Sequence, residues 1–159
     1  MPEYRLLRHE EMDAAARLHR RASATIPGHP VLHTPEEDRA FYRDTVFAAG
    51  PIWGAFEEDR LVGHMALSPG WIEHLCVDPD RHGQGLGRAL VTIGQREQDD
   101  LQLWTFQANA RARRFYERLG FVPEEFTDGA QNEVRQPDVR YRWRRAACPA
   151  SSPSLGDSA

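Results

Sequence analysis

The feature that most constrains this chain is a glycine-rich turn between a strand-like and a helix-like segment. The turn reads His82-Gly83-Gln84-Gly85-Leu86-Gly87 and follows an apolar stretch, Trp71 to Val77. Apolar residues then recur at helical spacing, at Leu86, Ala89, Leu90 and Ile93. A strand, a tight turn and a helix in this order point unpaired backbone N–H groups outward, and the helix dipole favours an anion there. The sequence therefore predicts a turn that holds phosphate groups.

The spacing of the glycines excludes two common nucleotide-binding turns. A dinucleotide fingerprint that begins at Gly83 needs a third glycine where Arg88 stands, and one that begins at Gly85 needs it where Leu90 stands. A Walker loop needs a lysine, and all 20 residues counted as lysine or arginine are arginines. Schiff-base catalysis is excluded for the same reason.

The rest of the chain alternates strand-like and helix-like segments. We expect strands at about 4–8, 52–57, 60–67, 71–77, 101–106, 121–126 and 138–144, and helices at about 10–22, 34–50 and 109–120, with a further helix that the glycine turn opens and that includes Leu86 to Ile93. Thr34-Pro35-Glu36-Glu37 forms a capping box at the second helix. Residues 1–145 are therefore expected to form one α/β domain. Residues 146–159, rich in Ala, Ser and Pro, are expected to be a disordered tail.

Composition narrows the class of protein. A chain of 159 residues can bury a substantial core. No apolar run approaches the roughly 20 residues of a membrane span, and no basic-then-apolar leader opens the chain, so neither membrane insertion nor secretion is expected. Two cysteines, Cys76 and Cys148, make no disulfide framework and indicate a cytoplasmic protein. The formal net charge of −4 argues against nucleic acid as a partner.

Two motifs in this order resemble the GNAT N-acetyltransferase superfamily. Its signature is Gln or Arg, two residues, Gly, one residue, then Gly or Ala, and this chain has His82-x-x-Gly85-x-Gly87. The segment from Asn109 through Phe115-Tyr116-Glu117 to Gly120-Phe121 is similar to the second motif of the family. His82 departs from the usual Gln or Arg but leaves the backbone donors intact. The resemblance is close over about residues 51–122 and looser from Thr34 to Trp143.

The resemblance implies a fold, a donor and a set of cofactor contacts. The fold would be α/β (α+β), with a mixed, mostly antiparallel central sheet of about seven strands flanked by about four helices. The donor would be acetyl-CoA, with no metal, and the acetyl group would pass directly to a primary amine. Its pantetheine arm would lie in a slot where the strand at 71–77 splays from that at 101–106. The implied cofactor-binding residues are the turn and first helical residues His82, Gly83, Gln84, Gly85, Leu86, Gly87 and Arg88, the strand residues Leu75, Cys76 and Val77, and Asn109.

The resemblance also implies catalytic roles. The Tyr116 hydroxyl would protonate the departing CoA thiolate, although inward helical tyrosines are often simply core residues. Glu73, His74 or water would take the proton of the attacking amine, and a histidine has the better unperturbed pKa, about 6.5. Cys76 is interpreted as a small core residue beside the cofactor rather than as a nucleophile.

Several alternatives stay open at this point. The acceptor is a small-molecule amine or an amine of a protein or peptide, and a homodimer is left open. A regulatory module of the same fold that binds acyl-CoA without catalysis is the alternative function. His29 and His33 lie in a proline-rich loop and do not predict a metal site. Acidic residues expected to attract a cationic amine on the acceptor side are Glu36, Glu37, Asp128, Glu133 and Asp138.

Overall fold

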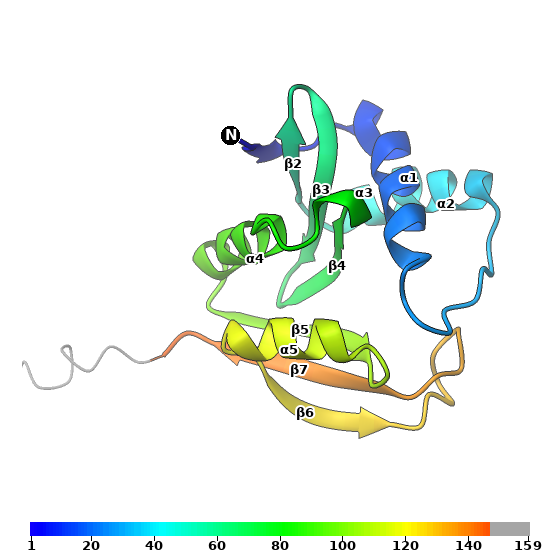
Figure 1. Cartoon of the computed structure of the whole chain (residues 1–159), viewed down its shortest axis with the longest axis vertical. Helices are drawn as coiled ribbons and strands as arrows, with labels where there is room; N and C mark the ends of the chain where they lie inside the picture. Colours follow the sequence, from blue (N-terminus) through cyan, green and yellow to red (C-terminus); the bar gives the residue numbers. More distant parts are fainter. Residues whose placement is uncertain (147–159) are drawn as a thin grey trace, which may run out of the picture.

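A mixed sheet in the strand order β1-β2-β3-β4-β5-β7-β6 forms the centre of the computed structural model (Figure 1). Residues 1–146 are described by the structure, so Cys148 and the expected tail beyond Ala146 lie outside the described residues. Only β4 and β5 are parallel neighbours among the described strands. The expected mixed, mostly antiparallel sheet of about seven strands is confirmed. The strands are β1 (Glu3–Leu6), β2 (Ile52–Glu57), β3 (Arg60–Ser68), β4 (Trp71–Val77), β5 (Asp100–Phe106), β6 (Val122–Thr127) and β7 (Asp138–Arg144).

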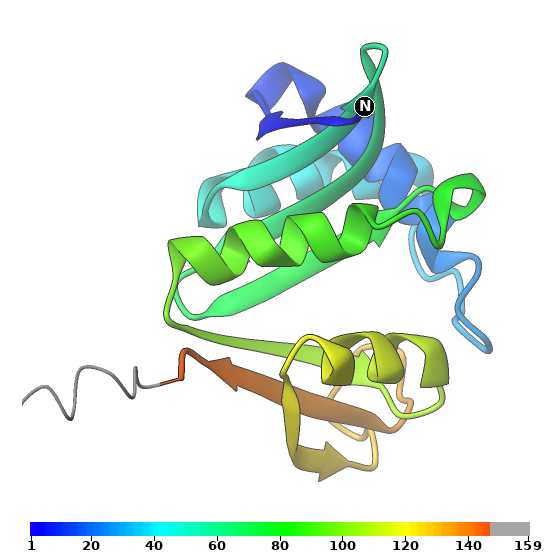
Figure 2. The same ribbon diagram turned by 60° about the vertical axis from the view of Figure 1, so that its left-hand side comes forward.

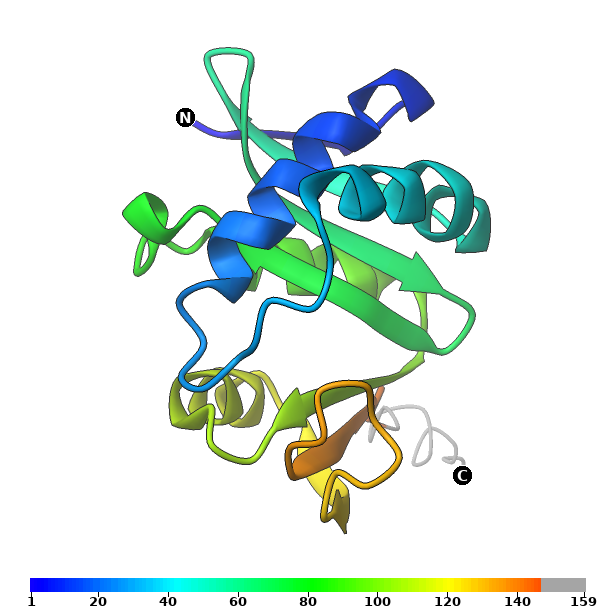
Figure 3. The same cartoon turned by 90° about the vertical axis from the view of Figure 1, so that its right-hand side faces the viewer.

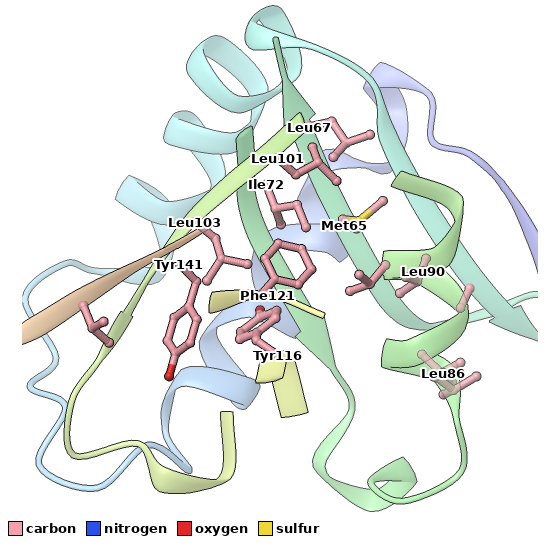
Figure 4. Packing of buried hydrophobic residues seen from close by; sticks show 14 residues of the cluster. Met65, Leu67, Ile72, Leu86, Leu90, Leu101, Leu103, Tyr116, Phe121 and Tyr141 are labelled. Carbon is pink, nitrogen blue, oxygen red and sulfur yellow. The ribbon is translucent and has the colours of Figure 1, made fainter. Parts of the chain in front are cut away.

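Helices cover the two faces of the sheet unequally. α1 (Met12–Ser23) and the continuous segment α2 (Pro35–Phe41), η2 (Tyr42–Val46) and α3 (Phe47–Ala49) cover one face of β2 to β4 (Figure 3). η2 is a π-helical turn. α4 (Leu86–Glu97) and α5 (Ala110–Arg118) lie on the opposite face, and a core of apolar side chains packs beneath them (Figure 4). None of the helices in the described part of the chain has the length and apolarity needed to cross a membrane.

Local interactions explain where the elements begin and end. The expected capping box is present, because Glu37 N–H donates to Thr34 Oγ1 (3.1 Å) and Thr34 N–H donates to Glu37 Oε1 (2.8 Å). The first strand ends at Leu6 rather than at residue 8, because Arg8 N–H donates to Glu11 Oε1 (2.8 Å) and starts a short 3-10 helix, His9–Glu11. α1 therefore begins at Met12, two residues later than expected.

The buried face of α4 differs from the expected one. Leu86 and Leu90 are buried as expected, but Ala89 and Ile93 are only half-buried. Gly94 takes a core position instead, because an ideal Cβ there would lie 3.3 Å from Met65 Cε of β3. The helix is thus rotated toward β3 by the close approach that Gly94 permits.

Candidate active site

A slot opens between β4 and β5. Over the described length of both strands, the parallel ladder pairs Trp71 with Gln102 and no further residues. Figure 2 shows the strands close together at that end and diverging toward the other, with α4 beside one strand and α5 beside the other. Since β3 occupies only one edge of β4, the backbone groups of Leu75 through Val77 that face the slot have no partner strand. This edge can form main-chain hydrogen bonds with an extended amide-bearing ligand.

The glycine turn lies at the open end of this slot. Gly85 is the N-cap of α4 and has a left-handed backbone (φ 84°), and an ideal Cβ there would meet no atom within 4 Å. The first turn of α4 therefore faces open space with unpaired backbone donors. Gly87 lets α4 pack closely against α5, since a Cβ at this position would lie 3.2 Å from the Phe115 ring of α5. The turn combines an exposed anion-binding end with close packing of α4 against α5.

Unpaired arginines gather on the two helices beside the slot. Most arginines elsewhere are in ion pairs, but Arg88, Arg96, Arg111, Arg114 and Arg118 have no carboxylate partner within residues 1–146. Arg111 Nη1 donates to His82 Nδ1 (2.7 Å), so α5 is linked to the glycine turn across the open end of the slot. Burial and the Arg111 charge lower the pKa of His82. Arg88 in the first turn of α4 and Arg111 in the first turn of α5 therefore place positive charge at the open end of the slot.

Glu73 and His74 occupy different environments on β4. The register between β3 and β4 shifts between Ala66 and Leu67, which leaves Glu73 as the bulged residue. Glu73 is exposed, and its Oε2 accepts a hydrogen bond from Ser68 Oγ (2.6 Å) at the β3–β4 turn. His74 is half-buried and turns toward α1 and α2. The bulge thus sends the two neighbouring side chains to different surroundings.

His74 belongs to a cluster of neutral polar rings. Its ring lies 5.1 Å from His19 and 5.7 Å from Tyr42, measured between ring centroids. Burial, with His19 and His64 as smaller causes, lowers the pKa of His74 to about 3. His74 is therefore neutral and weakly basic at neutral pH, unlike a histidine with the unperturbed pKa of about 6.5.

A hydrogen-bond chain fixes the tautomers behind His74. His64 Nε2 lies 3.1 Å from the Ala15 carbonyl oxygen, and because a carbonyl only accepts, Nε2 carries the proton. The Tyr42 hydroxyl then has His19 Nδ1 as its acceptor at 2.6 Å. His19 is left with its proton on Nε2. Residues from α1, η2 and β3 thus form a preorganised polar layer, which the sequence reading missed.

Tyr116 and Cys76 come from opposite sides of the slot, from α5 and β4. Tyr116 is 8% exposed, and its ring packs on Phe115, Phe121 and Tyr141. Its hydroxyl has no hydrogen-bond partner among the described residues, and burial, with the Cys76 thiol as a second cause, raises its pKa. Burial also raises the pKa of Cys76 to about 12, so this thiol stays protonated at neutral pH and is a poor nucleophile.

Comparison with known proteins gives this geometry a family. The acetyltransferase (GNAT) domain family matches residues 48–123. The chain is 38% identical over 72 residues to the peptidyl-lysine N-acetyltransferase YjaB of Escherichia coli (strain K12), a match that covers 45% of this chain and 49% of that protein. The solved apo-form of YjaB from Escherichia coli superposes with a TM-score of 0.74 at 25% identity, covering 92% of this chain and 99% of that one. The chain belongs to the GNAT acetyltransferases.

A second relative is named for a different acceptor than YjaB. The mycothiol acetyltransferase of Beutenbergia cavernae is 34% identical over 118 residues, which is 67% of this chain and 39% of that protein. The matches span about half the length of YjaB and 39% of the mycothiol acetyltransferase. The family resemblance and the fold expected from it are confirmed.

The second GNAT motif lies on the α5 side of the slot. Asn109 is the N-cap of α5, and its Oδ1 accepts from Ala112 N–H (3.1 Å). The arginines of this helix are not all solvated. Arg113 Nε donates to the Tyr141 hydroxyl (3.1 Å), while Arg111 reaches His82 at the GNAT turn. Among residues 1–146, no three His, Cys, Asp or Glu side chains form a group that could hold a metal ion.

The expected acidic lining of the acceptor side is largely engaged in other contacts. Glu36 pairs with Arg39 and Arg43, Glu37 closes the capping box, and Glu133 Oε2 lies 2.8 Å from His33 Nε2. Asp128 is exposed and accepts from Ala130 N–H (2.9 Å). Asp138 alone of these five acidic residues is buried within the described chain.

Proposed function

We propose that this GNAT protein transfers the acetyl group of acetyl-CoA directly to a primary amine. The observation that carries the proposal is the slot between β4 and β5, which has the glycine turn at the start of α4 at its open end and Tyr116 of α5 on one side. In this reaction the amine nitrogen forms a bond to the thioester carbon, and the carbon–sulfur bond breaks. The products are an N-acetylated amine and CoA.

The chain offers contacts along the whole length of the donor. Backbone N–H groups from His82 through Arg88 would bind the pyrophosphate, supported by the open geometry at Gly85. The slot-facing main chain at Leu75, Cys76 and Val77 would pair with the amides of the pantetheine arm, and Asn109 would border it from α5. Arg111 is our addition to this set, because its guanidinium already lies at the turn.

Tyr116 would act as the general acid. A hydroxyl with a raised pKa keeps its proton until a stronger base appears, and the departing thiolate is such a base. The absence of a competing hydrogen bond within the described residues leaves this proton free to be donated. The protonated Cys76 supports direct transfer rather than an acetyl-cysteine intermediate.

His74 would accept the proton of the attacking nitrogen late in the reaction. With a pKa of about 3, it is too weak to deprotonate a free alkylammonium ion, whose pKa is about 10. The nitrogen becomes far more acidic once it is bonded to the carbonyl carbon. The free acceptor would therefore lose its first proton to water, and the neutral imidazole would take the second. Glu73 is a weaker candidate because its carboxylate is held at Ser68.

The decisive experiment measures turnover. Purified protein, acetyl-CoA and a panel of amines should release free CoA thiol and give an acetylated product by mass spectrometry. Because the chain has no lysine, any acetyl-lysine detected after the reaction belongs to the peptide acceptor and not to the enzyme. Tight acetyl-CoA binding without turnover on any amine would instead support the non-catalytic acyl-CoA-binding module.

Gly85→Asp tests the donor site with a matched control. The variant places a negative charge where the pyrophosphate would bind, so calorimetry should show at least a tenfold loss of acetyl-CoA affinity, about 1.4 kcal/mol. Gly70→Asp is the control, because Gly70 also has a left-handed backbone (φ 82°) and no atom within 4 Å of an ideal Cβ, but lies at the closed end of the slot. Equal affinities in the two folded variants would overturn the assignment of the turn.

The pH dependence of the reaction tests His74. In the wild type, log kcat/KM should rise with unit slope up to the acceptor's own pKa, without a break near pH 6.5, because His74 does not titrate there. His74→Phe keeps a ring and removes the acceptor nitrogens, so kcat/KM should fall about tenfold or more at every pH. The kcat/KM of Glu73→Gln should stay within about a factor of two of the wild-type value. Wild-type rates in His74→Phe would assign the whole proton transfer to water.

A further inference from the structure

Three polar or charged side chains are buried within residues 1–146, and one of them is a carboxylate without a charged partner among these residues. Asp78 is neutralised, since its Oδ2 lies 3.1 Å from Arg21 Nη1 and 3.3 Å from Arg60 Nη2. His64 is uncharged at neutral pH, because burial lowers its pKa to about 3. The third is Asp138, which is 8% exposed.

Asp138 has polar partners but no cation. Its Oδ1 accepts a hydrogen bond from Thr127 Oγ1, and its Oδ2 accepts one from Asn132 Nδ2 (3.0 Å). No arginine or histidine of the described chain lies within ion-pair distance of it. Arg140, which follows on the same face of β7, points its guanidinium to Gln102, Glu124 and Glu125. A buried carboxylate without a counter-charge is costly, so its retention favours a cationic ligand.

A cavity lies in front of this carboxylate. It has a volume of about 430 Å³, and its aromatic walls are Trp104 and Phe106 of β5. Trp104 is 44% exposed, so its ring is accessible to a ligand from solvent. Aromatic faces and a carboxylate together are the chemistry that binds an ammonium group. The remaining lining residues are Thr105, Thr127, Gln131, Asn132 and Asp138.

The cavity adjoins the slot through β5. Phe106 is paired with Asp138 in the β5–β7 ladder, so the backbone of Asp138 lies one strand spacing, about 4.8 Å, beyond the strand that borders the slot. The ring of His29, from the loop between α1 and α2, lies 5.8 Å from the Phe106 ring. An elongated molecule lying across β5 could thus place one end in the slot and the other at Asp138.

We propose that this cavity binds a second cationic group of the acceptor, so that the acceptor is a small diamine. One amine would enter the slot and be acetylated, while the other would lie between Trp104 and Asp138. The inference rests on the proposed function for the reactive end, but the cation site stands on its own contacts.

Two loops favour a slim acceptor over a polypeptide. The loop between α1 and α2 contacts the loop between β6 and β7, where His33 contacts Glu133 (2.8 Å) and Gln136 Nε2 donates to the Gly28 carbonyl (2.6 Å). These contacts close over the end of β5 that carries Phe106. A flexible diamine passes beneath such a bridge more easily than a folded protein surface does.

The test compares matched acceptors in matched variants. Wild-type kcat/KM should be at least about tenfold higher for cadaverine than for n-pentylamine, a difference of about 1.4 kcal/mol. Asp138→Asn keeps groups that can bond Thr127 and Asn132 but removes the charge, so the ratio of kcat/KM for cadaverine to that for n-pentylamine should fall to about one. Asp128→Asn, the same charge change at an exposed site on the adjoining loop, should keep the preference.

Binding without turnover separates this inference from the proposed function. Cadaverine should bind the wild type measurably in calorimetry without acetyl-CoA, and at least about tenfold more weakly to Asp138→Asn. That result would uphold the cation site even if no amine were acetylated. Equal cadaverine and n-pentylamine rates with no binding difference between the variants would overturn it. So would a lysine peptide that is acetylated as well as cadaverine by both the wild type and Asp138→Asn.

Discussion

Tyr116→Phe is expected to lower kcat for acetyl transfer at least about tenfold, while the KM for acetyl-CoA changes only a few-fold. The hydroxyl stabilises the thiolate only as the carbon–sulfur bond breaks, so its loss affects the transition state more than the bound donor. Stopped-flow or steady-state measurement of CoA release gives both constants. The melting temperature should hardly change, because this hydroxyl has no hydrogen bond to lose within the described residues.

Tyr141→Phe is the matched control for this prediction. Tyr141 is equally inward-facing and fully buried, but its hydroxyl donates to Glu117 Oε2 (2.6 Å) and accepts from Arg113 Nε (3.1 Å). Removing it breaks both hydrogen bonds and should cost about 0.5–1.5 kcal/mol of unfolding free energy with kcat preserved. If Tyr116→Phe behaved like this control, with a lower melting temperature and normal kcat, Tyr116 would be a core residue.

The sequence predicts most reliably those features that depend on interactions between residues close together in the chain. The glycine turn, the capping box at Thr34 and the helical spacing that carries Tyr116 each depend on residues within a few positions of one another, and the structure has all three. The alternation of Val139 and Tyr141 with arginines likewise gives one buried and one outward face of β7.

The remainder of the site depends on contacts between distant segments. Arg111 reaches His82 from 29 residues away, and the polar layer behind His74 joins residues of α1, η2 and β3. Asp138 looked like one of five equivalent acidic residues in the sequence. Only tertiary packing distinguishes it, because the other four are exposed and bonded to near neighbours or across loops.

The unfolding free energy should fall as the pH is lowered from about 6.5 toward 5, with His64 as one of two main contributors beside His74. The pKa of this fully buried ring is lowered to about 3, whereas in the unfolded chain it is about 6.5. Between these two pKa values the ring binds a proton in the unfolded chain but not in the folded one. The contribution of His64 to the unfolding free energy is therefore complete above about pH 6.5 and is lost as the pH falls toward 3. At 1.36 kcal/mol per pH unit, His64 alone accounts for a loss of about 2 kcal/mol at pH 5.

His64→Gln isolates this contribution. The glutamine amide can still donate to the Ala15 carbonyl, as His64 Nε2 does at 3.1 Å, but it does not titrate. Urea unfolding at a series of pH values should give a shallower decline for the variant, by up to about one proton's slope between pH 6.5 and 5. His74, whose pKa is also lowered to about 3, would account for part of the slope that remains. Parallel curves for wild type and variant would show that the buried ring at position 64 takes up its proton in the folded state, and that the polar layer behind His74 is open to protons.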